Sequence, residues 1–375
     1  MKKTMMLTSV LSVFCFTGCE SAEATTETLK NTEMPAKLKA VKTIHFPDMA
    51  AHWAESSVKN GVAKGYVDGY EDSTFRPEQS VTRGEFIKMV MSAIKEPLDG
   101  SSAGLEWAQP YLAAAQDKGI WRENDFEAEQ LNEPISRLEM SRIALRAADH
   151  NLQNKAMQMD DHSIMFNSTR TGLIQGLAGG ELGLNRSTTR AQSVSMIERV
   201  LTVLDGGKLP VDKAAASYAE IELRGSNFET MWGIRVKEFP YDYHIGEGFD
   251  MTINKVVVID HSDSNSAYYE LYEDGRLGNG SSSYTMAYDI TLKNSTIKDS
   301  YIFYPRQSIG TVDYGASFKK EIELKSSIWM DQIGEYRGWM GFNAKKDTID
   351  NILNIGNSPR VILEVQSDSI NFAVR

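Results

Sequence analysis

A helix-start signal that occurs three times constrains the fold of this chain more than any other feature. It reads Thr82-Arg83-Gly84-Glu85, Ser136-Arg137-Leu138-Glu139 and Thr189-Arg190-Ala191-Gln192. Ser or Thr followed three residues later by Glu or Gln is a capping box, in which each side chain bonds the backbone N–H of the other residue. The three arginines stand 54 and 53 residues apart (137 − 83 and 190 − 137). A period of this length indicates an internal repeat of one supersecondary unit.

Each capping box lies between two helical patterns. Apolar residues at helical spacing follow the boxes, for example Phe86, Ile87 and Val90 after the first. A helical run that ends in glycine precedes each box, at Gly65, Gly119 and Gly172. The pattern predicts three helix–loop–helix repeats at about 44–98, 99–150 and 151–204.

The first repeat carries further marks around its box. It contains Phe46-Pro47-Asp48, then Trp53, a Gly-rich loop at 65–70 and Phe75-Arg76-Pro77. This order resembles an S-layer homology (SLH) repeat, which is marked by a Gly-rich loop, an aromatic-x-Pro and Thr-Arg-x-Glu. The second repeat lacks the Gly-Tyr loop, and the third has no tryptophan comparable to Trp53 or Trp107. The resemblance implies an all-α, pseudo-threefold domain that binds secondary cell-wall polysaccharide, often through a pyruvylated sugar.

The arginines of the boxes are the best candidates for a binding site. Each stands one residue after the N-cap, where we expect free backbone N–H groups and the helix dipole to favour an anion. A guanidinium adds a fork that fits a carboxylate. We expect Arg83 to contribute most to binding, Arg190 less and Arg137 least, because the first repeat keeps the whole pattern, the third keeps its glycines and the second has lost the loop. The glycan-binding positions that the resemblance implies are Arg83, Arg137, Arg190, Asp48, Trp53, Gly69 and Tyr70. In the alternative interpretation, the arginines only pair with neighbouring carboxylates, and Trp53 and Trp107 belong to the core.

The first residues have the pattern of an export signal. Residues 1–18 combine Lys2-Lys3 with an apolar stretch too short to span a bilayer. Phe16-Thr17-Gly18-Cys19 resembles a lipobox, which predicts a lipid anchor on Cys19; the alternative is a plain signal peptide cleaved near Ala22 or Ala24. Residues 19–43 lack aromatic side chains and are rich in Thr, Ala, Glu and Lys, as is typical of a disordered linker.

The hydrophobic pattern of the sequence changes after the repeats. Residues 205–217 contain Gly206-Gly207 and Pro210 and are predicted to be a linker. From residue 218 to residue 375, short stretches alternate with period two, which predicts an all-β antiparallel sandwich that weakly resembles Ig-like domains. The prediction is therefore of a multidomain chain. The expected strands are 220–224, 251–260, 267–272, 288–293, 299–304, 320–325, 335–342, 360–366 and 369–374, with 241–244 as a strand edge or loop.

Composition restricts the partners and the chemistry. A net charge of −11 without a basic run argues against nucleic-acid binding. Both cysteines lie in the first twenty residues, so the folded part has no disulfide or Cys-ligated metal. No metal-binding histidine spacing, Gly-x-Ser-x-Gly or phosphate loop occurs, and 260–265 is interpreted as a polar loop rather than a calcium site. We predict no cofactor and no metal.

These observations predict an exported, extracytoplasmic protein of the cell envelope. It would be bound to secondary cell-wall polysaccharide or peptidoglycan-linked glycan, anchored to the membrane by lipid, or both. It would not be an enzyme and would display a C-terminal binding module. The alternative is a cell-wall hydrolase that the repeats only localise, with its active site in 218–375.

Overall fold

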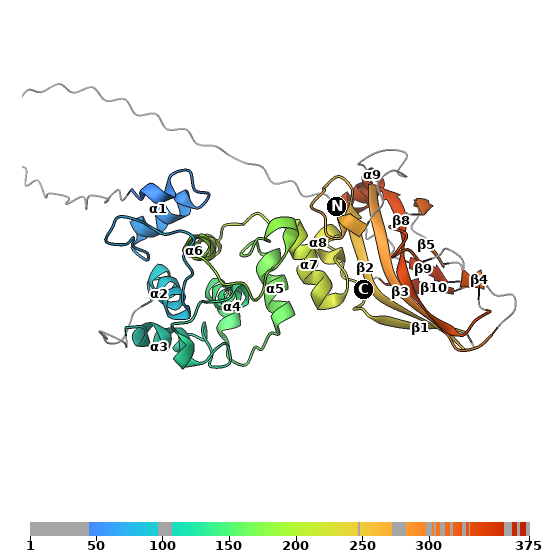
Figure 1. Cartoon of the computed structure of the whole chain (residues 1–375), viewed down its shortest axis with the longest axis horizontal. Helices are drawn as coiled ribbons and strands as arrows, with labels where there is room; N and C mark the ends of the chain where they lie inside the picture. The colour runs from blue at the N-terminus through green and yellow to red at the C-terminus, as the bar shows by residue number, and fades with distance from the viewer. Residues whose placement is uncertain are drawn as a thin grey trace, which may run out of the picture. The chain divides into compact units, whose positions relative to one another are not determined.

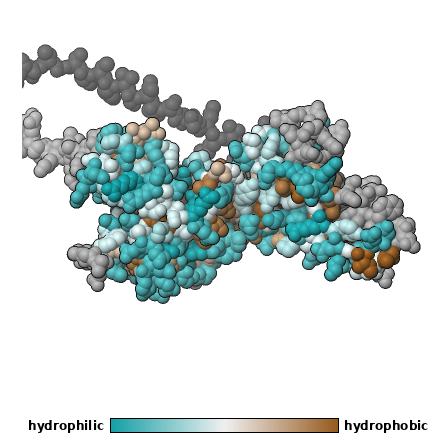
Figure 2. Space-filling view, viewed as in Figure 1, coloured by the Kyte–Doolittle hydropathy of each residue, from teal (hydrophilic) through white to brown (hydrophobic). Residues whose placement is uncertain are grey.

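The computed structural model describes residues 45–96, 107–246, 248–271 and 283–297, and later in the chain 302–303, 305–307, 312–315, 318–324, 328–329, 331–355, 362–365 and 368–372. The predicted signal sequence, Cys19 and the linker to residue 43 lie outside these residues. Within them, every helix is too short or too polar to cross a bilayer. The face drawn in Figure 2 is mostly hydrophilic, in keeping with the charge of the chain.

Three helix pairs form the first part of the described chain (Figure 1). The members of each pair are consecutive in the chain: α1 (Glu55–Lys64) and α2 (Arg83–Ala93), α3 (Gln109–Asp117) and α4 (Arg137–Ala148), and α5 (Asp161–Arg170) and α6 (Arg190–Leu204). In space the first helix of each pair packs against a helix of another pair: α1 against α6, α3 against α2 and α5 against α4. The three predicted capping boxes are confirmed at the starts of α2, α4 and α6. Gly65, Gly119 and Gly172 follow the first helix of each pair with positive φ, a conformation that stops a helix at little cost only for glycine.

A closed ring of backbone hydrogen bonds joins the three pairs. The N–H of Val81 donates to the carbonyl of Thr188 at 3.0 Å, that of Thr188 to Ile135 at 2.9 Å, and that of Ile135 to Val81 at 2.9 Å. All three residues are fully buried. The ring relates the pairs by an approximate threefold axis, and one apolar core takes side chains from all of them, including Phe86, Ile143 and Val194.

Short 3-10 turns complete the helical part. They are η1 (Pro47–Met49), η3 (Ala128–Gln130), η4 (His150–Gln153) and η5 (Ala178–Gly180). η1 precedes α1, and η5 lies in the loop between α5 and α6. These two turns shape loops that enter the candidate site.

The predicted linker and first strand are partly wrong, because α7 (Lys213–Arg224) and α8 (Phe228–Trp232) occupy this stretch. Asp212 caps α7 by accepting from the N–H of Ala215 at 3.0 Å, and Gly225 ends it with φ of 71°. The alternation at 220–224 covers five residues, too few to set the period against a helix that is capped at both ends. Ala219 packs in the core of the helix pairs, so the helical part continues past residue 204.

An antiparallel sheet of five described strands follows, in the order β1-β2-β3-β8-β6. Its strands are β1 (Tyr241–Gly246), β2 (Phe249–Asp260), β3 (Ser283–Asn294), β8 (Gly334–Lys345) and β6 (Val312–Gly315). Met251 lies opposite Leu292, which lies opposite Tyr336 on the next strand. Strands predicted at 251–260, 288–293 and 335–342 are confirmed, and 241–244 is the edge strand β1.

Two small sheets and a helix accompany the large sheet. β9 (Ile362–Val365) pairs with β10 (Asp368–Asn371) and with β5 (Pro305–Gln307), and β4 (Ile302–Phe303) pairs with β7 (Ile328–Trp329). The strands predicted at 360–366 and 369–374 are thus confirmed in their cores, and only 302–303 of the 299–304 strand is described as β4. The helix α9 (Lys346–Asn354) packs on the sheet through the fully buried Ile349.

The expectation of an all-β second part is therefore wrong. Helices α8 and α9 lie within it, residues 267–271 form a turn with η6 (Tyr269–Leu271), and 319–322 form a turn instead of a strand. Tertiary contacts override the alternation at 320–325: Glu323 forms one isolated bridge to Trp339 and does not extend a strand. A helical part followed by a β part with its own helices is the observed architecture.

Candidate functional site

The N-terminal N–H groups of α2, α4 and α6 are not free for an anion, contrary to expectation. The N–H of Arg83 donates to the carbonyl of Glu133 at 3.0 Å and that of Gly84 to Leu131 at 2.9 Å. The third N–H, of Glu85, goes to the hydroxyl of the cap Thr82. The same pattern recurs at α4 and α6, since each repeat seats its helix start on the loop of another. An anion at these helix starts would therefore have to be bound by side chains.

The guanidinium groups also reach into the loop of another repeat. Arg190 donates from Nε to the carbonyl of Phe75 at 3.0 Å and from Nη2 to that of Asp68 at 2.8 Å. Arg137 donates in the same way to the carbonyls of Leu182 at 2.9 Å and Gln175 at 2.8 Å. Carbonyls carry no charge, so these two arginines keep theirs uncompensated by an ion pair with any described residue.

Arg83 differs from the other two. Its Nη2 lies 2.8 Å from Oε1 of Glu139 and its Nη1 lies 2.7 Å from Oε2 of Glu133. Burial opposes its protonation, but these two carboxylates raise the pKa of Arg83. The alternative interpretation, pairing with neighbouring carboxylates, thus holds for Arg83 alone among the three.

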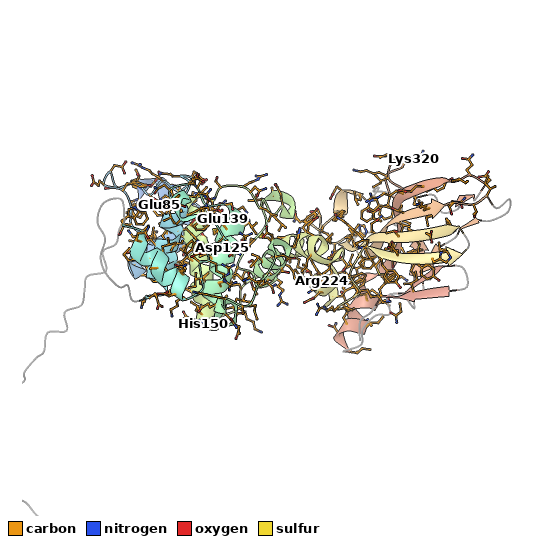
Figure 3. All side chains as sticks on the ribbon, turned by 90° about the horizontal axis from the view of Figure 1, so that it is seen from below. Glu85, Asp125, Glu139, His150, Arg224 and Lys320 are labelled. Atoms are coloured by element: carbon orange, nitrogen blue, oxygen red, sulfur yellow. The ribbon has the colours of Figure 1, made fainter. Side chains whose placement is uncertain are left out.

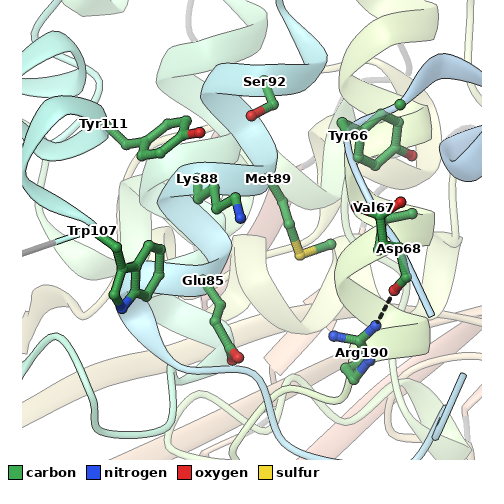
Figure 4. Close-up of a pocket in the computed structure, with 11 residues that line it drawn as sticks. Tyr66, Val67, Asp68, Glu85, Lys88, Met89, Ser92, Trp107, Tyr111 and Arg190 are labelled. Atoms are coloured by element: carbon green, nitrogen blue, oxygen red, sulfur yellow. Dashed lines mark hydrogen bonds between the residues drawn. The ribbon is translucent and has the colours of Figure 1, made fainter. Parts of the chain in front are cut away.

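One cavity, of about 490 Å³, opens beside Arg190 and is named here the Arg190 groove (Figure 4). Lys88 projects into it with Nζ 5.6 Å from the ring centroid of Trp107 and forms no ion pair with the described residues. Glu85 also lines it, but its carboxylate is held by the N–H of Thr82 at 2.9 Å. The other lining residues include Tyr66, Asp68, Met89, Ser92 and Tyr111.

A second cavity, of about 200 Å³, lies beside Arg137 and is named here the Arg137 groove. No Asp or Glu is among its described lining residues, which include Trp53, Arg137, Gln175, Gln192, Ser195 and Arg199. Arg199 donates to the carbonyl of Leu173 at 3.1 Å and to Oε1 of Gln175 at 3.2 Å. Burial lowers the pKa of Arg137, with the nearby Arg199 adding to the effect, and burial lowers the pKa of Arg199. Both remain cations at neutral pH, so an anion would relieve their repulsion.

The two grooves are built from corresponding positions of the repeats. Counting from the capping boxes, Glu85, Lys88 and Ser92 of α2 correspond to Gln192, Ser195 and Arg199 of α6. Trp107 and Trp53 each stand two residues before a first helix, α3 and α1. Each groove therefore combines an arginine from a helix start, a second cation on a helix face and an indole ring.

The third set of corresponding positions is filled by ion pairs. Arg142 pairs with Asp161, and Arg146 pairs at 2.5 Å with the buried Asp125, which Figure 3 labels within the helical part. With Arg83 bound to Glu133 and Glu139, each of these cations has a carboxylate partner. Within the described part of the chain, this position offers no uncompensated charge of the kind found in the Arg137 groove.

Three of the remaining predicted residues build the loop of the first repeat. Both carboxylate oxygens of Asp48 accept from the N–H of Phe75 at 3.0 Å, and one accepts from the N–H of Arg76 at 2.7 Å. A Cβ on Gly69 would lie 2.0 Å from the ring of Phe46, so only glycine permits this packing. Tyr70 lies under the guanidinium of Arg76 at 3.9 Å and near that of Arg190 at 5.0 Å.

Trp53 lines the Arg137 groove and is 61% exposed, so the core interpretation is wrong for it. Trp107 is half-buried. Sequence reasoning missed Lys88, Ser195 and Arg199. Counting three and seven residues onward from the third residue of each capping box would have found them, because these positions share one helix face.

Comparison with known proteins assigns a class to the first repeat: residues 45–87 match the S-layer homology domain. The chain is similar to exoglucanase XynX of Acetivibrio thermocellus, with 26% identity over 179 residues, 43% of this chain and 16% of that protein. It is 38% identical over 84 residues to a cellulosome-anchoring protein of the same organism, 21% of this chain and 19% of the relative. Similarity to S-layer protein EA1 of Bacillus anthracis is 25% over 244 residues, 60% of this chain and 27% of the relative. The chain thus spans less than a third of each of these relatives.

Proposed function

We propose that this protein is exported and attaches non-covalently to an anionic cell-wall polysaccharide through the Arg190 and Arg137 grooves. The observation that carries the proposal is the Arg137 groove, which Arg137, Arg199 and the exposed Trp53 line without a carboxylate from any described residue. The S-layer homology match supports it, as do similarities to proteins named for S-layers and for anchoring.

The chemistry of the Arg137 groove suits an acidic sugar such as a pyruvylated one. A guanidinium binds a carboxylate with charge-assisted hydrogen bonds, which are stronger than neutral ones. The indole of Trp53 offers an apolar face to a sugar ring, and the hydroxyl of Ser195 is buried without a hydrogen-bond partner among the described residues. A sugar hydroxyl would satisfy it.

The grooves should contribute unequally. Among the described residues, the Arg137 groove is lined by two cations and no carboxylate, whereas the Arg190 groove is lined by Arg190 and Lys88 together with Asp68 and Glu85. At the third position, the charge of Arg83 is taken by Glu133 and Glu139. We therefore replace the expectation that Arg83 contributes most with the order Arg137 groove, Arg190 groove, third position.

Co-sedimentation with purified cell-wall sacculi tests the proposal. The full chain should pellet with sacculi that carry their attached polysaccharide and stay in solution with sacculi from which the polysaccharide has been removed by acid. Equal binding to both preparations would contradict it.

We propose further that Cys19 carries a lipid, so that the protein tethers membrane to wall. The support is the Phe16-Thr17-Gly18-Cys19 pattern. Mass spectrometry of the native N-terminus should show a lipid-modified Cys19, and an unmodified N-terminus downstream of Cys19 would contradict this.

For residues 218–375 we propose a displayed binding module without hydrolytic activity. The support is the lack of a nucleophile motif in the sequence. The alternative, a hydrolase localised by the repeats, predicts release of reducing sugar from sacculi by the full chain. The module proposal predicts none.

A further inference from the structure

We infer that Asp212, which lies after the three helix pairs, is a positioning residue that holds both arginines of the Arg137 groove in place. This inference rests on the proposed function for its consequence in binding. Its structural part concerns the loop between α5 and α6 and the start of α7.

One residue of that loop holds both cations. The carbonyl of Gln175 accepts from Arg137 at 2.8 Å, and its side-chain Oε1 accepts from Arg199 at 3.2 Å. The carbonyl of Leu173 accepts from Arg199 at 3.1 Å. Residues 173–175 thus accept hydrogen bonds from both guanidinium groups, through two backbone carbonyls and the side chain of Gln175, and the carbonyl of Leu182 accepts a further bond from Arg137.

Asp212 fixes this backbone from outside the repeats. Its Oδ2 accepts from the N–H of Gly176, the residue after Gln175, at 2.9 Å. Its Oδ1 accepts from the N–H of Ala215 at 3.0 Å in the first turn of α7, where the helix dipole favours a carboxylate. One side chain thus joins the loop to the helix start.

The segment around Asp212 also packs tightly on both ends of the loop. A Cβ on Gly180 would lie 2.8 Å from that of Ala214, and a Cβ on Gly172 would lie 2.7 Å from that of Leu209. Both glycines have positive φ and lie against residues 209–215, so a side chain at either position would push the loop and this segment apart.

In the Arg190 groove, too, a carboxylate holds the loop that positions an arginine, but it comes from another part of the chain. Asp48 holds the N–H groups of Phe75 and Arg76, and the carbonyl of Phe75 accepts from Nε of Arg190. Asp48 precedes α1, whereas Asp212 follows α6. In both grooves a carboxylate outside the helix pair fixes a loop that aims an arginine.

Asp212→Asn in the full chain tests the inference. The asparagine oxygen can still cap α7, but its amide nitrogen cannot accept from the N–H of Gly176. We expect faster hydrogen exchange in the peptide that contains Gly176 and about tenfold weaker binding to polysaccharide-bearing sacculi. Asp160→Asn is the matched control, because Asp160 caps α5 through the N–H of Ser163 and lines neither groove.

Two readouts separate positioning from general damage. The effect of Asp212→Asn on binding should disappear when Arg137 and Arg199 are both already alanine, because the two guanidinium groups that the loop positions are then absent. A loss of similar size in that background would overturn the inference, as would unchanged exchange at Gly176 in the single variant. If the wild-type chain did not bind sacculi, the proposed function would fail, and exchange at Gly176 would still decide whether Asp212 holds the loop.

Discussion

At the scale of single residues, the charge of each groove is decided by which side chain stands at corresponding helix positions. α6 places Arg199 where α2 has Ser92 and α4 has Arg146, and only Arg146 meets a buried carboxylate, Asp125. A cation without a carboxylate partner gains most from an incoming anion, because a paired cation must first give up its partner.

Arg199→Gln should therefore weaken binding to polysaccharide-bearing sacculi by about tenfold, the size of one charge-assisted hydrogen bond. Arg142→Gln is the control, since Arg142 lies on the corresponding face of α4 but is paired with Asp161. Binding isotherms of the two variants should differ. An equal loss in both would show that the overall charge, rather than the Arg137 groove, sets the affinity.

Trp53 and Trp121 should respond oppositely to truncation. Trp53 is 61% exposed, so Trp53→Ala should leave the melting temperature nearly unchanged and weaken sacculus binding. Trp121 is 3% exposed in the core, so Trp121→Ala should lower the free energy of unfolding by about 3–5 kcal/mol. Thermal melts together with binding measure both. A strongly destabilised Trp53→Ala variant would show that Trp53 belongs to the core.

At the scale of elements, the features that could be predicted from the sequence are those that depend on residues close together in the chain. The boxes at Thr82, Ser136 and Thr189 start helices because cap and partner lie three residues apart in one chain. The grooves could not be predicted in this way, because Arg190 meets Asp68 and Phe75 from more than a hundred residues away. The α7 helix was missed because the alternation of five residues at 220–224 was interpreted as a strand, and the helix cap at Asp212 was not recognised.

The α9 helix was missed for a related reason, since its docking depends on a distant strand. Lys346 lies 2.7 Å from Oδ2 of Asp260 at the end of β2, and Tyr284 donates to Asp350 of α9 at 3.0 Å. Burial works against ionisation of Asp260, yet hydrogen bonds from Lys346 and Ser262 lower the pKa of Asp260 overall. Burial likewise opposes the charge on Lys346, but Asp260 and Tyr284 raise its pKa.

These shifts give the sign of a pH dependence. A lowered carboxyl pKa contributes stability above its unfolded value of 3.8, which is lost as the pH falls through the folded value. The raised pKa of Lys346 contributes below 10.5 and is lost in strong alkali. Lys346→Met should cost about 1–3 kcal/mol of unfolding free energy at pH 7 and less at pH 3, below the unfolded value of 3.8. Denaturant unfolding at both values measures this, and an equal cost at pH 3 would contradict it.

At the scale of the whole molecule, α7 belongs to more than one core. Ala219 packs among the helix pairs, and Ile221 packs with Val257 and Ala287 of the large sheet. Glu220, on the same helix, accepts from the N–H groups of Glu229 and Thr230 at the start of α8. The linker expected at residues 205–217 therefore overlaps the start of α7, the helix that packs against both the helix pairs and the large sheet.

Fragments that end on either side of α7 should consequently differ. Residues 45–225 keep Asp212 and the packing of Ala219 and Leu223 on the helix pairs, whereas residues 45–204 lose both. We expect the longer fragment to melt higher and to bind sacculi more tightly, because the loop that aims Arg137 and Arg199 stays fixed. Introducing Asp212→Asn into the longer fragment should remove most of its advantage in binding but little of its advantage in melting temperature. If the two fragments bound equally well, α7 would have no part in binding, and the helix pairs alone would form the complete binding unit.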